Sequence, residues 1–123
     1  MGVIILKNIY FGKTVLITGH SGFKGSWLSL WLQKLGVELV GFSKSIPTQP
    51  SLFELADVGK NMTSIMEDIT NIERITNVIK QHNPEIIIHM AAHSDVTYCN
   101  LNPTKCYELN VKSTQKMLEV ARK

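Results

Sequence analysis

The stretch Thr18-Gly19-His20-Ser21-Gly22-Phe23-Lys24-Gly25 decides the fold. It follows a short apolar run, residues 13–18, whose length and β-branched side chains predict a buried strand. Apolar residues then recur at steps of three and four, which predicts a helix that ends at Gly36. These apolar positions are Phe23, Trp27, Leu30, Trp31 and Leu35, and we expect the two tryptophans to pack in the core.

Each glycine of this loop has its own physical reason. Gly19 permits the tight turn out of the strand, Gly22 lets the backbone approach a pyrophosphate, and Gly25 lets the helix pack closely on the sheet. The start of a helix also presents unpaired N–H groups and a partial positive charge to phosphates. The loop therefore predicts a dinucleotide site, the alternative being a plain strand–helix turn that needs glycine for its geometry alone. The candidate cofactor-binding residues here are Gly19, His20, Ser21, Gly22, Phe23, Lys24 and Gly25.

Two orientations suit the side chain of His20, the second residue of the loop after Thr18. Its imidazole either lies over the loop and contacts phosphate, or points into solvent without a role.

Strands and helices continue to alternate along the chain. Further strands are predicted over residues 37–42, 62–66 and 85–89, the last buried on both faces because it holds three consecutive isoleucines. Ser51 and Asn71 are expected to cap helices. Four strand–helix units predict an α/β fold, namely a Rossmann-type parallel sheet with helices on both faces that is incomplete in this chain.

The composition is that of an ordinary globular chain, with 44% hydrophobic and 19% charged residues. Basic residues are scattered rather than gathered in a stripe, so no nucleic-acid partner is expected. No apolar run reaches the roughly 18 residues of a spanning helix, and residues 3–6 are too short for a signal peptide. We therefore expect a cytoplasmic chain with no membrane partner.

Cysteines and histidines do not suggest a metal site. Cys99 and Cys106 lack metal-ligand spacing, and reduced thiols are expected rather than a disulfide. His89 and His93 fall on a strand and its following loop, where they would not share a face.

The end of the second predicted strand is where an acid normally binds the adenosine ribose of NAD. This region reads Gly41-Phe42-Ser43-Lys44 and holds no acid. Ser43 can hydrogen-bond a ribose hydroxyl, and Lys44 could meet a 2′-phosphate. The alternative is a solvated loop without a ligand.

Two runs of sequence resemble a known family. Residues 12–32, with the core Thr-Gly-x-x-Gly-Phe-x-Gly and the narrower Phe-Lys-Gly-Ser-Trp-Leu, resemble the start of CDP-glucose 4,6-dehydratases. Residues 47–54, Pro-Thr-Gln-Pro-Ser-Leu-Phe-Glu, are similar to the same subgroup of the extended short-chain dehydrogenase/reductases. The resemblance covers nearly all of this chain but only the first part of such an enzyme.

The resemblance implies NAD as cofactor and adds site residues to those of the loop. Asp68 and Ile69 match the pair that contacts the adenine edge, although Asp68 could instead only cap the next turn. Asn110 matches a family position and is expected to be a structural bridge between strands rather than a chemical group. The segment after the fourth strand, where small residues let the chain pass against the dinucleotide, supplies Ala91, Ala92 and His93.

Departures from the family pattern concern mainly the sugar nucleotide. Ser113-Thr114 stand where glycine and threonine are usual, and Thr97, Cys99 and Asn100 fall where the dehydratases have an Arg and a Ser-Tyr pair. The catalytic Tyr-x-x-x-Lys is absent, because Tyr10, Tyr98 and Tyr107 are followed four residues later by Thr14, Asn102 and Val111. Without it the chain has no base for a sugar hydroxyl, so no catalytic residue is expected within it.

Residues 1–123 are therefore interpreted as the N-terminal, NAD-binding portion of a nucleotide-sugar 4,6-dehydratase, a lyase of deoxysugar and lipopolysaccharide biosynthesis. The catalytic pair and the sugar-nucleotide-binding part lie outside it. The resemblance implies that the complete enzyme acts on CDP-glucose and is a homo-oligomer, with this chain alone inactive. Alternatives are another NAD-dependent nucleotide-sugar epimerase or reductase, and a dinucleotide-binding module without catalysis.

The fourth strand and the last helix are expected to lack partners in a chain of this length. Residues 86–88 would form an apolar open edge, because the strand that normally covers them is missing. The helix opened by Pro103 carries the apolar positions Leu109, Met117, Leu118 and Ala121.

Overall fold

The computed structural model describes residues 2–123 and contains one parallel sheet of four strands in the order β3-β2-β1-β4. Along the chain the strands are β1 (Thr14–Thr18), β2 (Glu38–Ser43), β3 (Thr63–Met66) and β4 (Ile86–His89). Leu16 of the central strand β1 lies opposite Val40 of β2 and Ile87 of β4. The predicted α/β fold, a Rossmann-type parallel sheet, is confirmed.

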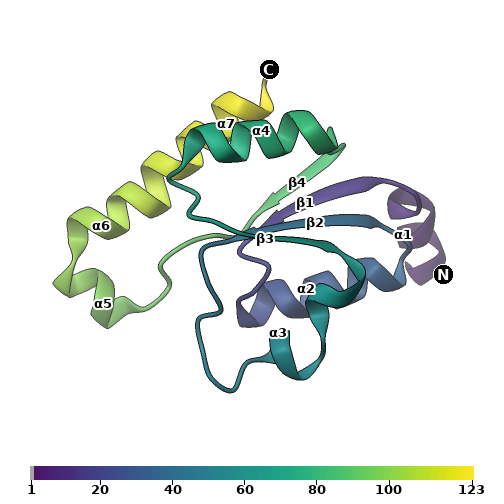
Figure 1. Cartoon of the computed structure of the whole chain (residues 1–123), viewed down its shortest axis with the longest axis horizontal. Coiled ribbons are helices and arrows are strands. Elements are labelled where there is room, and N and C mark those ends of the chain that lie inside the picture. The colour runs from purple at the N-terminus through teal and green to yellow at the C-terminus, as the bar shows by residue number, and fades with distance from the viewer. Residues whose placement is uncertain (1) are drawn as a thin grey trace.

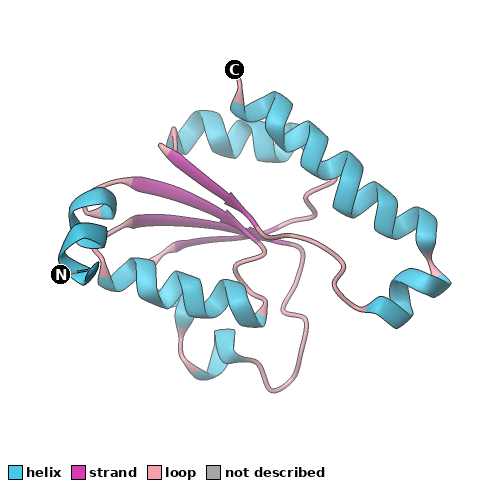
Figure 2. Ribbon diagram, turned by 180° about the vertical axis from the view of Figure 1, so that it is seen from behind, coloured by secondary structure: helices cyan, strands magenta, loops and turns pink. Residues whose placement is uncertain are grey.

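Helices cover both faces of the sheet, as Figures 1 and 2 show from opposite sides. One face carries α2 (Phe23–Lys34), with the short α3 (Leu52–Leu55) and the 3-10 turn Val58–Asn61 beside it. The other face carries α4 (Ile72–His82) and the last helix, which runs without a break through α6 (Pro103–Tyr107), a π-helical segment (Glu108–Lys112) and α7 (Ser113–Ala121).

Caps at both predicted positions are present. The side chain of Ser51 accepts a hydrogen bond from the backbone N–H of Glu54, and that of Asn71 accepts one from Arg74. Two further helices, α1 (Gly2–Tyr10) and α5 (Val96–Leu101), were not expected from the sequence. No helix in residues 2–123 combines the length and apolar character needed to cross a bilayer.

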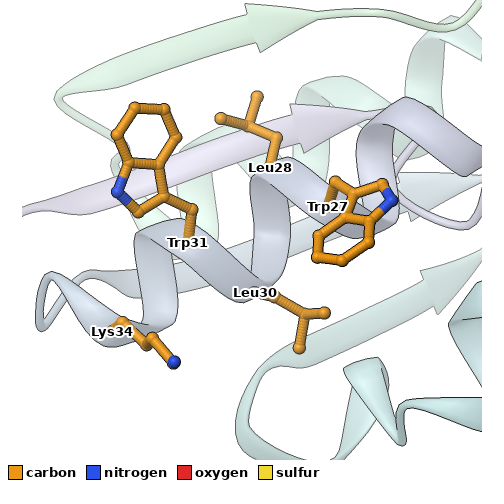
Figure 3. Close-up of a pocket in the computed structure, with 5 residues that line it drawn as sticks. All are labelled: Trp27, Leu28, Leu30, Trp31 and Lys34. Carbon is orange, nitrogen blue, oxygen red and sulfur yellow. The ribbon is translucent and has the colours of Figure 1, made fainter.

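The expectation that the two tryptophans of α2 pack in the core is wrong. Trp27 and Trp31 are 56% and 52% exposed and lie on the outer face of the helix around an apolar depression of about 520 Å³ (Figure 3). The face turned to the sheet is instead lined by small residues and one leucine, namely Gly25, Ser26, Ser29 and Leu32. Small side chains let the helix axis come close to the sheet, which leaves the bulky residues outside.

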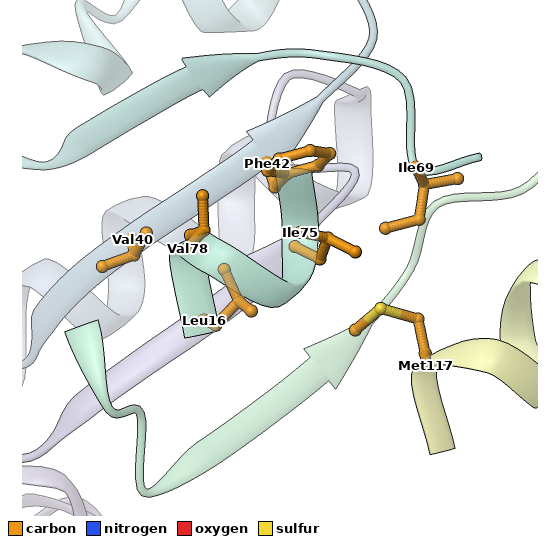
Figure 4. Close-up of a cluster of buried hydrophobic side chains, with 7 residues drawn as sticks. All are labelled: Leu16, Val40, Phe42, Ile69, Ile75, Val78 and Met117. Carbon is orange, nitrogen blue, oxygen red and sulfur yellow. The ribbon is translucent and has the colours of Figure 1, made fainter. Parts of the chain in front are cut away.

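One of the two hydrophobic cores lies on the opposite face of the sheet, between the strands and α4 (Figure 4). Alternate strand residues point to this side, so Leu16, Val40 and Phe42 meet Ile75 and Val78 of α4. Met117 of α7 and Ile69 complete the cluster, which corrects the expectation that Met117 lacks a partner in this chain. This packing fixes the carboxyl ends of β1 and β2, from which the loops of the candidate site emerge.

The fourth strand is only half-buried, which corrects the expectation that it is buried on both faces. Ile87 packs toward the α4 side and Ile86 and Ile88 toward the α2 side, yet all three stay partly exposed. The reason is position, because within residues 2–123 β4 pairs with β1 alone and forms an edge of the sheet.

Candidate functional site

A cleft of about 820 Å³ opens where the loops leave the carboxyl ends of β1, β2 and β4. This is the place where open parallel sheets bind ligands, between strands whose connections run in opposite directions. The charged residues that line it are Lys24 and Lys44, and no acid lines it, so the cleft suits an anionic ligand. Its lining consists of Gly19, Ser21, Gly22, Phe23, Lys24, Gly25, Ser43, Lys44, Ser45, Pro47, Thr48, Met90, Ala91, Ala92, His93, Ser94 and Leu109.

The three loop glycines are required for different reasons. Gly19 has φ +81°, a conformation that side chains rarely adopt, and Gly25 packs so closely that a Cβ would collide with the backbone of Gly19. Gly22 has neither constraint, since its φ is −73° and a Cβ there would find only the Gly19 carbonyl oxygen, at 3.5 Å. The protein itself therefore tolerates a side chain at Gly22, and the space beside it opens into the cleft.

Gly22 also begins α2 without a side-chain cap. The first N–H groups of a helix have no intrahelical partners, and in a helix of 12 residues they end a substantial dipole. Gly22, Phe23, Lys24 and Gly25 line the cleft at this end. The arrangement can bind a phosphate or pyrophosphate through the backbone.

Ser43 lies at the end of β2 and faces the cleft, with 5% of its surface exposed. Its Oγ accepts a hydrogen bond from the backbone N–H of Ser21 at 3.2 Å, and the hydroxyl of Ser21 donates to the carbonyl oxygen of Ser45 at 2.6 Å. These bonds tie the glycine loop to the end of β2, so that the predicted phosphate and ribose positions form one rigid unit.

The side chain of His20 takes neither predicted orientation. It is fully buried beneath the loop, where its Nδ1 lies 3.0 Å from Ser43 Oγ and its Nε2 lies 2.7 Å from Ser64 Oγ. Its ring meets that of Phe53 edge to face at 5.4 Å, and any side chain in place of Gly41 would collide with it. Direct contact between this imidazole and phosphate is therefore excluded.

Burial lowers the pKa of His20 from 6.5 to about 4, although the Phe42 carbonyl opposes part of the change. Because the folded chain then binds this proton less readily than the unfolded chain, stability is full above about pH 6.5 and falls toward pH 4. We expect a loss of about 3 kcal/mol over this range in urea unfolding. Burial lowers the pKa of His89 as well, so His89 adds to the loss below pH 6.5, whereas Asp68, whose pKa is lowered from 3.8, adds its own loss only at still lower pH.

The variant His20→Asn is the control for this prediction. Without the imidazole of His20 the curve between pH 6.5 and pH 4 is expected to become less steep, with the remaining slope due to His89. An unchanged slope in the variant would contradict the prediction.

Asp68 lies beside the cleft but outside its lining. One carboxylate oxygen accepts hydrogen bonds from the N–H and hydroxyl of Thr70, and the other lies 3.1 Å from Lys44 Nζ. Partial burial would raise the pKa of Asp68, but these hydrogen bonds and the lysine lower it overall. The structure thus shows Asp68 in the turn-capping role, and its contact with adenine stays a prediction. The side chain of Ile69 is 4% exposed and packs in the core, so only its backbone could serve a ligand.

The segment after β4 passes directly against the glycine loop. A Cβ on Gly19 would lie 3.0 Å from the backbone N of Ala91, and Ala91, Ala92 and His93 all line the cleft. Asn110 holds this segment, since its side chain accepts from the N–H of His93 at 2.8 Å and donates to the His93 carbonyl at 3.0 Å. Asn110 thus has a structural role, but it joins the last helix to the loop after β4 rather than bridging two strands as expected.

The two cysteines form a disulfide, which corrects the expectation of reduced thiols. Cys99 lies in α5 and Cys106 in α6, and Pro103 starts a new helix between them. The resulting turn brings their Cα atoms within 5.5 Å of each other. The disulfide therefore ties α5 to the helix that carries Asn110.

Some lining residues were missed by the sequence analysis. Pro47 and Thr48 belong to the run that resembles the dehydratases, and Met90 lies within the segment that resembles the family, so a signal for all three was present. Ser94 directly follows the segment that resembles the family, whereas Ser45 and Leu109 carry no such signal and reach the cleft only through the folding of their loop and helix.

Comparison with known proteins shows the family to which the chain belongs. The model of the family described as GDP-mannose 4,6 dehydratase matches residues 16–123. The chain belongs to this family. It is 43% identical over 119 residues to the CDP-glucose 4,6-dehydratase of Salmonella typhimurium, covering 97% of this chain and 33% of that protein. The chain thus spans about a third of the length of that relative, and the resemblance seen in the sequence is confirmed.

Solved structures of epimerases share the fold. The epimerase Mth375 of Methanothermobacter thermautotrophicus superposes with a TM-score of 0.83 at 28% identity, covering 97% of this chain and 34% of that one. The UDP-glucose 4-epimerase of Brucella ovis, solved in complex with NAD, gives a TM-score of 0.77 at 26% identity, covering 90% and 32%.

Proposed function

We propose that the chain is the NAD-binding part of a nucleotide-sugar 4,6-dehydratase whose complete form acts on CDP-glucose. The observation that carries this proposal is Gly22, a glycine that the protein's own packing and backbone do not require. It lies at an uncapped helix start in a cleft lined by two lysines and no acid. A pyrophosphate lying against the backbone explains why no side chain stands there.

The loops after β1, β2 and β4 would each hold a different part of NAD. The N–H groups at the start of α2 would hold the pyrophosphate, and the Ser43 hydroxyl would bond a ribose hydroxyl. The small residues Ala91 and Ala92 would let the other half of the dinucleotide pass along the loop after β4. When bound, NAD supplies a site that accepts a hydride from the sugar and returns it. The chain's own residues bind and orient this cofactor.

CDP-glucose as substrate is supported by the relative that is 43% identical over almost all of this chain. A second candidate within the same chemistry is an epimerase of another nucleotide sugar, supported by the epimerase structures that share the fold. The two candidates are expected to differ mainly in how the complete protein binds the sugar.

Titration calorimetry tests the cofactor. We expect NAD to bind weakly, because the chain carries the phosphate loop but spans only about a third of the length of its relative. NADP is expected to bind no better than NAD, since Lys44 is paired with Asp68 at 3.1 Å. Absence of NAD binding would overturn the proposal, and a clear preference for NADP would show that Lys44 binds a 2′-phosphate.

The chain alone is expected to convert no CDP-glucose. It holds no Tyr-x-x-x-Lys pair, so no tyrosine with a lowered pKa is available to take the sugar proton. Incubation of the purified chain with CDP-glucose and NAD, followed by chromatography of the nucleotide sugars, checks this. Appearance of a 4-keto-6-deoxy product would contradict it.

A further inference from the structure

His20 is a buried polar side chain that direct ligand binding does not explain. It is fully buried, yet both ring nitrogens have partners, Ser43 Oγ at 3.0 Å and Ser64 Oγ at 2.7 Å. Gly41 of β2 lies directly beside this ring, and a Cβ at this position would collide with the ring. Burial of a polar ring is costly unless it is hydrogen-bonded, so this site is built around the imidazole.

The hydrogen-bond capacity of Ser43 shows what the imidazole does. A serine hydroxyl has one donor and two acceptor positions. The Ser43 Oγ uses one acceptor position for the backbone N–H of Ser21 and a second position for His20 Nδ1. A single position then remains, and Ser43 lines the cleft. The bond to the imidazole therefore limits the direction in which the Ser43 hydroxyl can bond a ligand in the cleft.

We infer that His20 is a positioning residue for the cofactor: it holds the Ser43 hydroxyl, from below the loop, in the orientation that bonds the ribose of NAD. Ser64 of β3, which does not line the cleft, anchors the far side of the ring through Nε2. Two hydrogen bonds thus join Ser64 to His20 and His20 to Ser43, whose hydroxyl would bond the ligand; we call this chain of bonds the relay. This inference rests on the proposed function, because it needs NAD in the cleft.

Two substitutions of His20 test whether its side chain orients the Ser43 hydroxyl or only fills the space beneath the loop. Asn carries its amide at about the place of Nδ1 and can still bond Ser43, whereas the amide of Gln reaches toward Nε2 and Ser64. We expect calorimetry to give His20→Asn an NAD affinity between those of the parent chain and His20→Gln, because Asn bonds Ser43 but does not reach Ser64. His20→Gln is expected to bind NAD about three- to tenfold more weakly, as is Ser43→Ala, because one hydrogen bond is lost.

A double-mutant cycle across the ring gives a second measurement that leaves the imidazole in place. Ser64→Ala is expected to weaken NAD binding in the parent chain, by less than Ser43→Ala does. In the Ser43→Ala background the same change is expected to have no effect, because the relay has lost its end. This cycle decides the question even where a His20 variant does not fold.

These experiments distinguish failure of the positioning role of His20 from failure of NAD binding itself. If all the folded variants bind NAD as the parent does, or if the effects of Ser64→Ala and Ser43→Ala add, the relay is overturned while NAD binding stands. Better binding by His20→Gln than by His20→Asn overturns it as well. If the parent chain binds no NAD, the proposed function fails and the relay with it.

Discussion

Replacing Gly22 with Val is expected to abolish NAD binding while the chain stays folded. A side chain at this position would project into the cleft at the start of α2, where the pyrophosphate would lie. A steric cost of about 3 kcal/mol corresponds to about a hundredfold loss of affinity, which takes weak binding below detection. Calorimetric titration with NAD measures this loss, and equal affinity in the variant would contradict the phosphate-loop assignment.

Gly25 supplies the matched control. Gly22 has an ordinary extended backbone and room for a Cβ, so its substitution is expected to cost about 1 kcal/mol of stability or less. A Cβ at Gly25 collides with the Gly19 backbone, so Gly25→Ala is expected to unfold the loop or the whole chain. Thermal melting therefore separates the two. A large drop in the melting midpoint of the Gly22 variant would mean that the protein, rather than a ligand, needs this glycine.

The sequence predicted the sheet and its helices because each strand and helix carries its own local signal. The β-branched runs gave all four strands to within about one residue at each end, and the caps at Ser51 and Asn71 are present. The helix α1 was missed because its apolar residues have no capping signal before them, and α5 because only Asp95 marks its start in a polar stretch.

The error over Trp27 and Trp31 has a different cause. Periodicity shows which residues share one face of a helix, but not which face meets the sheet. In α2 the close approach to the sheet needs Gly25, Ser26 and Ser29, so the small residues lie inside. Hydrophobicity alone gives the opposite orientation.

For the site, local motifs located the backbone parts and missed the long-range contacts. The glycine loop and the segment 91–93 line one cleft as their positions after neighbouring strands predict. The burial of His20 depends on Gly41 and Ser64 from two other strands, and the disulfide depends on the turn between α5 and α6. Neither contact has a signal within the sequence around the residue concerned.

The edge strand β4 and the last helix are the surfaces through which the isolated chain is expected to self-associate. In residues 2–123 the outer edge of β4 has no partner strand, and open apolar edges are sites of association. The last helix adds exposed apolar side chains, with Leu118 68% and Val111 47% exposed. We expect the chain to form oligomers through β4 or this helix, with β4 dominant because unpaired backbone groups and apolar side chains coincide there.

Concentration is the variable that tests this. For a dimer, each tenfold rise in protein concentration stabilises the assembled state by about 1.4 kcal/mol, so the melting midpoint is expected to rise with concentration. Hydrogen exchange at the β4 amides is expected to slow over the same range if the strand is the contact. Leu118→Lys reports on the helix, and Leu55→Lys, at a residue 78% exposed on α3, is its matched control. Two results together would contradict association: light scattering that reports a monomer at high concentration, and a melting midpoint that does not change with concentration. The open edge of β4 would then be stable without a partner strand.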